Sequence, residues 1–191
     1  MTLKSIFISI FLIFSFENIY SQNLEFYRED ICFEIKDQYF YVDGVYYFCN
    51  VGKDSVKSLL FYPFPEDSTY GKVDSICITS LTDSSNAMLD VSQSGAQFVV
   101  RIKPYGSNKF NISYRQKIVG GKAEYILLTT RQWGKQFEQI NYKLTLPDNI
   151  KIRSLSYLSD SSYTIIRKVV YLWHKENFMP DKNMLIEFSH F

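Results

Sequence analysis

The histidines and carboxylates of the sequence do not form a recognisable catalytic motif. There is no G-x-S-x-G, H-E-x-x-H, P-loop or G-x-G-x-x-G pattern, and no Asp-rich calcium loop. A Ser-His-Asp or Cys-His arrangement would have to use His174 or His190, the two histidines of the chain. His190 is the penultimate residue, where chains fray, and the run around His174 indicates a half-exposed strand position.

Two pairs of acidic residues, Glu29-Asp30 and Glu66-Asp67, are adjacent in the sequence. Neighbouring side chains of a strand point to opposite faces, so neither pair can form the facing carboxylates of a glycosidase. We interpret both as solvated surface or turn features. The sequence therefore predicts a protein that is not an enzyme and that has no cofactor and no metal site.

Three cysteines, Cys32, Cys49 and Cys77, permit at most one intramolecular disulfide with one thiol left over. None of them stands in a C-x-x-C spacing, which gives a zinc site little support. The favoured reading is that all three are small, mostly buried strand residues. One disulfide remains the alternative, since exported proteins form them.

Aromatic residues offer two candidate recognition features. The segment 131–135 (RQWGK) joins two predicted strands, and its Trp133, flanked by Arg131, could stack on a sugar ring or receive a peptide. Alternatively, Trp133 folds inward and closes one end of the core. The tyrosines of segment 39–62 fall on both faces of their strands, so Tyr41 and Tyr47 are candidate ligand contacts, with cross-strand packing as the alternative.

Alternating apolar residues predict an all-β fold that positions these side chains. In segment 87–102 a turn at Ser94-Gly95, with a positive φ at Gly95, would pair Val91 with Phe98. In segment 110–130 a turn at Gly120-Gly121 would extend into a second hairpin. Further strands are predicted at 30–36, 39–49, 56–64, 72–81, 137–146, 150–158, 165–175 and 184–188.

Two interruptions of the strand pattern refine this prediction. Gly44 could mark a bulge or bend in its strand, and the run from Pro147 to Asn149 predicts a turn or a corner at which the chain changes sheets. No helical period extends over 11 residues or more. The prediction is a single antiparallel β-sandwich of about ten strands.

Two stretches resemble exported bacterial β-sandwich proteins of unassigned function. Segment 29–65 contains an alternating strand followed by the strand end FYPFP, and segment 123–147 contains YILLTTRQW leading into a strand. The resemblance implies a periplasmic or surface-exposed sandwich, and it implies no chemistry.

The N-terminus has the order of a secretory signal: a basic start at Lys4, an apolar run from Ser5 to Phe16, and a small residue, Ser21. The apolar run is too short to span a bilayer, which takes about 20 residues. We predict a signal peptide at 1–21, a β-sandwich domain at 22–191, export to the periplasm or cell surface, and no membrane span after cleavage.

The charge balance narrows the partner classes. With 21 basic and 20 acidic residues, the net charge of +1 provides no field that would attract nucleic acid, and a hydrophobic content of 46% is too high for a disordered chain. The leading hypothesis is a non-enzymatic interaction or structural module of the cell envelope, with an envelope protein or a glycan as partner. A carbohydrate-binding module using Trp133 and the tyrosines is the alternative. A small outer-membrane β-barrel is a further one, although the row Leu185, Glu187, Ser189 suits lipid poorly.

Overall fold

The computed structural model describes residues 23–65 and 69–189, which form thirteen strands and one short 3-10 helix. In chain order these are β1 (Leu24–Lys36), β2 (Tyr39–Asn50), β3 (Val56–Pro63), β4 (Val73–Ser80), β5 (Met88–Val91), β6 (Gly95–Ile102), β7 (Ser107–Lys117), β8 (Lys122–Tyr125), η1 (Leu128–Trp133), β9 (Phe137–Pro147), β10 (Lys151–Leu155), β11 (Ser161–Ile165), β12 (Lys168–Phe178) and β13 (Met184–Ser189). The prediction of an all-β fold is confirmed. The predicted signal peptide lies outside the described residues and stays a prediction.

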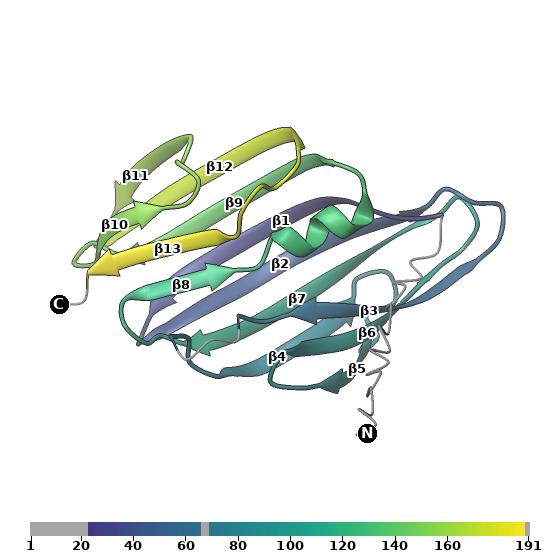
Figure 1. Cartoon of the computed structure of the whole chain (residues 1–191), viewed down its shortest axis with the longest axis horizontal. Coiled ribbons are helices and arrows are strands. Elements are labelled where there is room, and N and C mark those ends of the chain that lie inside the picture. Colours follow the sequence, from purple (N-terminus) through teal and green to yellow (C-terminus); the bar gives the residue numbers. More distant parts are fainter. Residues whose placement is uncertain (1–22, 66–68, 190–191) are drawn as a thin grey trace, which may run out of the picture.

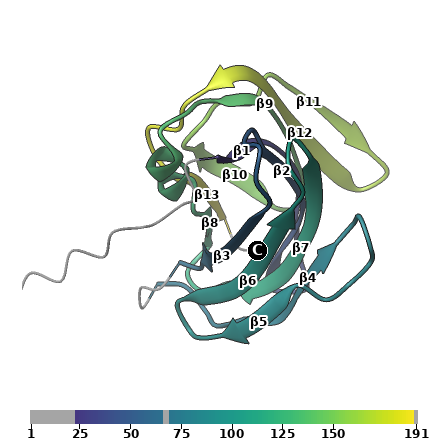
Figure 2. The same ribbon diagram turned by 90° about the vertical axis from the view of Figure 1, so that its right-hand side faces the viewer.

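The strands form one large sheet and two small ones. The large sheet has seven strands in the order β11-β12-β9-β1-β2-β7-β4, and the small sheets have the orders β10-β13-β8 and β3-β6-β5. Both small sheets lie on the same face of the large sheet (Figures 1 and 2). Strands β1 and β9 run parallel, while the other neighbours in the large sheet are antiparallel. The predicted single antiparallel sandwich is therefore confirmed only in part: the strands form two layers, but the large sheet is mixed rather than antiparallel, and the layer facing it is divided into two small sheets.

The turn at Gly120-Gly121 forms as predicted, but the hairpin does not continue beyond it. Both glycines have positive φ, and Val119 bridges Lys122 across the turn. Because β7 already has β2 and β4 on its two edges, β8 has no place beside it and pairs with β13 instead. This departure carries β8 from the large sheet into the layer that faces it.

The predicted register of the β5–β6 hairpin is two residues out. Val91 pairs with Ala96 rather than with Phe98, and Gly95 has no positive φ. Its small size serves a different purpose, since a Cβ on Gly95 would lie 2.3 Å from the backbone oxygen of Tyr62 on β3. Glycine is therefore required by the close approach of two strands.

The bulge predicted at Gly44 is absent, whereas the corner predicted after Pro147 is present. Strand β2 runs through Gly44 without a bulge, and a Cβ there would meet the ring of Tyr46 at 2.8 Å. Gly44 thus leaves room for an inward-facing aromatic ring. The corner after Pro147 is confirmed, because β9 belongs to the large sheet and β10 to a small one.

The hydrophobic core fills the space between the two layers. Alternate residues of β1, β2, β7 and β9 point into it, and large side chains such as Phe33, Phe40, Phe110, Leu144 and Phe188 are almost completely buried. No helix in the described part of the chain is long and apolar enough to cross a membrane.

Substituting Gly95 tests the close contact between β3 and β6. We expect Gly95→Ala to lower the free energy of unfolding by about 1–3 kcal/mol, because the added methyl group overlaps backbone that cannot rotate away. Gly106→Ala is the matched control: its added Cβ would lie 3.1 Å from the nearest atom, so a smaller loss is expected. Urea unfolding of both variants measures the difference, and equal losses would contradict this role of Gly95.

Candidate ligand-binding cleft

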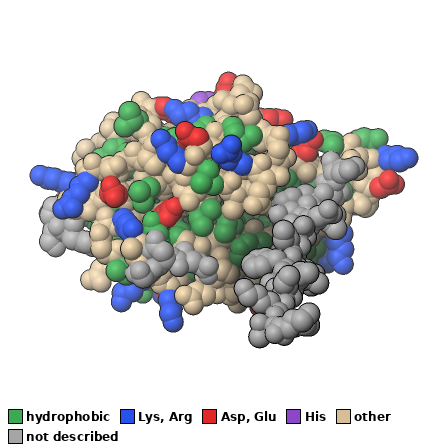
Figure 3. Space-filling model, in the orientation of Figure 1, with side chains coloured by type: hydrophobic (Ala, Val, Ile, Leu, Met, Phe, Trp, Pro, Cys, Tyr) green, Lys and Arg blue, Asp and Glu red, His purple; other side chains and the backbone are tan. Residues whose placement is uncertain are grey.

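A cleft opens where the two small sheets fail to join. Strand β8 is the edge of one small sheet and β3 the edge of the other, and the large sheet forms the floor between them. The cleft has a cavity volume of about 60 Å³ and is partly open to solvent. Its lining comprises Phe26, Glu29, Tyr46, Phe48, Leu60, Phe61, Tyr62, Pro63, Phe98, Ile112, Tyr125, Ile126, Thr129, Thr130 and Trp133. On this side of the molecule, hydrophobic side chains reach the surface among charged groups of both signs (Figure 3).

Among the described residues that line the cleft, Glu29 carries the one carboxyl group, and it is completely buried. Tyr142 donates a hydrogen bond to its Oε1, and Tyr125 donates one to its Oε2 at 3.0 Å. Burial raises the pKa of Glu29 to about 7, because desolvation outweighs the stabilisation of the ionised form by the two tyrosines. The nearby charge of Asp30 adds to the increase.

Three tyrosines link Glu29 to β3 on the far side of the cleft. The Tyr46 hydroxyl lies 3.2 Å from that of Tyr125 and 2.8 Å from that of Tyr62. A phenol has one proton, and Tyr125 donates its proton to Glu29. Tyr46 must therefore donate to Tyr125, and Tyr62 to Tyr46. We call Tyr62, Tyr46 and Tyr125 the tyrosine relay. Burial raises the pKa of all three well above its usual value.

An irregularity in β1 turns Glu29 into the core. The pairing of β1 with β2 shifts register between Phe26 and Arg28, which marks a bulge. Before this point the even-numbered Leu24 and Phe26 are buried, and after it the odd-numbered residues from Glu29 onward are. A strand without the bulge would direct Glu29 to the opposite face.

The sequence-based reading of Glu29 as a solvated residue is wrong. The change of phase is present in the sequence, because the apolar residues Leu24 and Phe26 are out of step with Ile31 and Phe33. A strand that keeps both sets inside must contain an extra residue between them. That reasoning places Glu29 on the inner face, and it is the signal that could have identified the site.

Trp133 and Arg131 both lie on η1, and Trp133 is part of the lining of the cleft. The half-buried Trp133 ring packs against Phe26 and Phe48, with centroid distances of 5.9 and 5.8 Å. It also borders a second, more polar pocket of about 390 Å³, partly open to solvent, which is lined by Leu24, Glu25, Phe26, Tyr27, Trp133, Lys135, Gln136 and Glu138. Arg131 is exposed and lines neither space.

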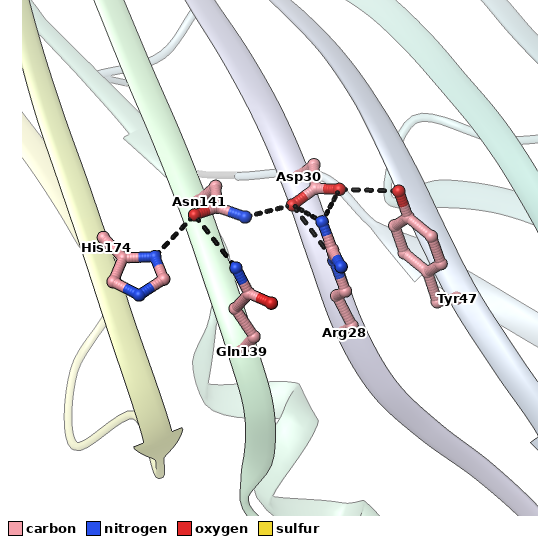
Figure 4. A network of polar contacts seen from close by, with 6 residues as sticks. All are labelled: Arg28, Asp30, Tyr47, Gln139, Asn141 and His174. Carbon is pink, nitrogen blue, oxygen red and sulfur yellow. Dashed lines mark hydrogen bonds and ion pairs between the residues drawn. The ribbon is translucent and has the colours of Figure 1, made fainter.

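Tyr41 and Tyr47 lie on the opposite, outer face of the large sheet. The hydroxyl of Tyr47 donates to Asp30 at 2.6 Å, in a ladder of polar contacts that crosses β2, β1, β9 and β12 (Figure 4). Asp30 also accepts hydrogen bonds from Arg28 at 2.9 Å and from Asn141 at 2.6 Å. His174 completes the row, with its Nδ1 2.7 Å from Oδ1 of Asn141.

The rings of the outer-face tyrosines Tyr41 and Tyr47 already form cation–π contacts with lysine and arginine side chains of the same chain. Arg28 and Lys109 lie 4.8 and 5.0 Å from the ring centroid of Tyr47, and Lys36 lies 4.8 Å from that of Tyr41. Although partial burial raises the pKa of Asp30, hydrogen bonds from neighbouring groups outweigh this and hold it below its usual value. On this outer face, the charged groups and the tyrosine rings are therefore already paired with other groups of the same chain.

The four predicted contact residues are thus not brought together. Trp133 and Arg131 lie on the covering layer, while Tyr41 and Tyr47 lie on the other side of the large sheet. The cleft instead uses Tyr46 and Tyr62, from the same tyrosine-rich stretch.

The cysteines and histidine add no further site. Cys32, Cys49 and Cys77 stand on strands as free thiols, but Cys32 and Cys77 are exposed rather than buried. His174 occupies an exposed position on β12. Within residues 23–65 and 69–189, no three His, Cys, Asp or Glu side chains are grouped so that they could hold a metal ion.

The comparisons with known proteins show the fold alone. No family model matches the chain, and no curated protein matches it. A Legionella pneumophila protein provisionally described as nutrient binding superimposes with a TM-score of 0.66 and 13% identity, over 87% of this chain and 67% of the other. An M1 zinc metallopeptidase from Deinococcus radiodurans, bound to a Tyr-Ser-Ala substrate, gives a TM-score of 0.55 and 6% identity. That match covers 86% of this chain and 42% of the metallopeptidase, so the chain corresponds to less than half of the enzyme.

The burial of Glu29 makes stability depend on pH. Its pKa of about 7 exceeds the ordinary value of 4.5, so the folded protein binds the proton more tightly than the unfolded chain does. The stability contributed by this proton is complete below the unfolded pKa and is lost as the pH rises through about 7. Between pH 4.5 and pH 8.5 the loss amounts to about 3 kcal/mol.

Glu29→Gln, which mimics the protonated side chain, should remove this contribution. The comparison is the difference in free energy of unfolding between wild type and Glu29→Gln at pH 5 and at pH 8.5, which cancels the contributions of other groups. We expect Glu29→Gln to gain stability relative to wild type at the higher pH. A difference that does not change with pH would show that Glu29 has no raised pKa.

Proposed function

We propose that the chain is an exported, non-enzymatic binding module of the cell envelope, and that it holds a small organic ligand in the cleft between β3 and β8. The observation that carries the proposal is the cleft itself: an aromatic-lined space whose lining includes the three tyrosines of the relay. Apolar walls with a few placed polar groups are typical of small-molecule sites. The ligand that suits them has a compact apolar body and one group that forms hydrogen bonds.

The position of Glu29 favours binding over catalysis. Its side chain is completely buried, and both of its oxygens already accept a hydrogen bond from a tyrosine. A general acid or base must reach the proton that it transfers, directly or through one water.

Two further observations support the envelope setting and the type of ligand. The N-terminal sequence has the pattern of an export signal. The Legionella protein of similar fold is provisionally described as nutrient binding, and this chain likewise has a cleft lined by aromatic side chains. Together they favour capture of a small extracellular or periplasmic compound.

Benzyl alcohol, an aromatic ring with a single hydroxyl, is the probe that tests the cleft. We expect saturation-transfer NMR to detect its binding to the wild-type mature domain. Thr129→Phe should abolish the signal, because Thr129 lines the cleft and a phenyl ring there would fill it. Thr164→Phe is the matched control, since Thr164 is exposed on β11 and lines no part of the cleft. A signal that persists in Thr129→Phe would contradict the proposed site.

A carbohydrate ligand in the polar pocket beside Trp133 is the second candidate. The pocket brings an indole ring together with Glu25, Gln136 and Glu138. Ring stacking on tryptophan combined with carboxylate and amide groups for the hydroxyls is suited to sugars. Tyr41 and Tyr47 would take no part, because they lie on the other side of the large sheet.

Tryptophan fluorescence separates this candidate from the first. The chain has two tryptophans, so Trp173→Phe leaves Trp133 as the single reporter. Binding of cellohexaose or chitohexaose in the polar pocket should change that fluorescence, and Glu138→Ala should weaken the response. Unchanged emission with both oligosaccharides would argue against a sugar site at Trp133.

A further inference from the structure

We infer that the cleft selects an organic ammonium ion, with Glu29 as the buried counter-charge and the tyrosine relay as the acceptor of its hydrogen bonds. The inference rests on the proposed function and names the chemical class of its ligand. Three independent features of the described residues lead to it: the charge of the lining, the direction of the relay, and the aromatic walls.

The charges of the lining favour a cation. Of the described residues that line the cleft, Glu29 is the one with a carboxyl group, and none is a lysine, arginine or histidine. The ordinary cost of burying a carboxylate is reduced when a positive charge lies nearby. An anionic ligand would meet the opposite situation, a negative charge in a medium that screens it poorly.

The hydroxyl groups of the relay also favour a cationic ligand. Because every proton of the relay is directed toward Glu29, the oxygen of Tyr62 receives no proton from within the relay. It also forms a hydrogen bond with Tyr114, which must be the donor because the proton of Tyr62 goes to Tyr46, so one lone pair of Tyr62 is left for a ligand. Tyr62 is the end of the relay most distant from Glu29 in the row, and it belongs to β3 and to the lining of the cleft. The relay thus offers acceptors to a donor such as an N–H⁺ or a polarised N–CH₃ group.

The walls supply aromatic surface for a cation that has lost its water. The rings of Tyr46 and Tyr62 are perpendicular, with centroids 5.6 Å apart, and Phe26, Phe48 and Trp133 continue the wall on the other side. A cation within about 6 Å of an aromatic ring face is attracted by the ring quadrupole, more strongly when desolvated. Ammonium ions with a small apolar body combine both requirements.

Binding of a cation should be linked to loss of the Glu29 proton. The groups that face Glu29 are tyrosines from the elements packed against it, and Asp30 on its own strand points to the other face of the sheet. Those tyrosines are Tyr46 on β2, Tyr62 on β3, Tyr125 on β8 and Tyr142 on β9. Burial raises the pKa of each of these tyrosines, so each stays neutral while Glu29 titrates near pH 7. The ionised carboxylate binds a cation better than the protonated acid does, so affinity rises with pH.

Choline and its uncharged carbon isostere, 3,3-dimethylbutan-1-ol, test the inference. Calorimetric titration of the mature domain at pH 5.5 and pH 8.5 should show choline binding roughly tenfold to thirtyfold more tightly at the higher pH, as the ionised fraction of Glu29 grows. The alcohol should bind equally at both pH values. In Glu29→Gln the pH dependence for choline should disappear, while the alcohol is unaffected.

Tyr62→Phe provides a second variant in case Glu29→Gln does not fold. It removes a phenol oxygen that could contact the polarised N–CH₃ groups of choline, which the uncharged alcohol lacks, so it should weaken choline binding more than binding of the alcohol. Equal affinity for choline and the alcohol, or choline binding that ignores both pH and these substitutions, would overturn the ammonium assignment. Failure of the proposed function is a separate result, recognised by the absence of benzyl alcohol binding in the wild type.

Discussion

The burial of one carboxyl group organises the interior of this protein. Removing the Glu29 side chain from water is unfavourable unless hydrogen-bond donors replace the solvent. The chain meets this requirement with tyrosines from four strands, since Tyr142 and Tyr125 donate to Glu29 directly and Tyr46 and Tyr62 continue the row. These strands belong to all three sheets. The polar cluster therefore fixes the positions of the two small sheets relative to the large one, beyond what apolar packing alone would specify.

The cleft follows from the way these layers meet. The edges of β3 and β8 face each other across the relay without pairing as neighbouring strands. Had β8 remained beside β7 as the hairpin pattern suggests, the covering layer would lack the strand that supplies Tyr125. Because β7 is already flanked by β2 and β4, β8 is displaced to the edge of the other small sheet. The same crowding that breaks the simple sandwich thus creates the space above Glu29.

Local patterns in the sequence predicted local structure well. The alternation of apolar residues identified most strands, the glycine pair at 120–121 located a turn, and Pro147 located the corner between two sheets. Pairing between strands that are distant in the sequence could not be predicted, since nothing near Asp30 indicates that β1 pairs in parallel with residues around Asn141. The register at Ser94-Gly95 failed because close contact with Tyr62, rather than turn geometry, determines why glycine stands there. For the candidate site, the tyrosine-rich stretch was recognised, but which of its residues face inward depends on pairings that the sequence does not contain.

Glu29 and Asp30 show how one strand can give adjacent carboxyl groups opposite properties. Asp30 faces outward, where Arg28, Tyr47 and Asn141 keep it ionised, and its pKa is lowered. Glu29 faces inward, where burial raises its pKa to about 7. The outer face therefore carries a fixed charge that is already balanced by the protein, whereas the charge of the inner face changes within the physiological range of pH. A ligand gains most where the protein has left a charge without a cation, and that place is the cleft.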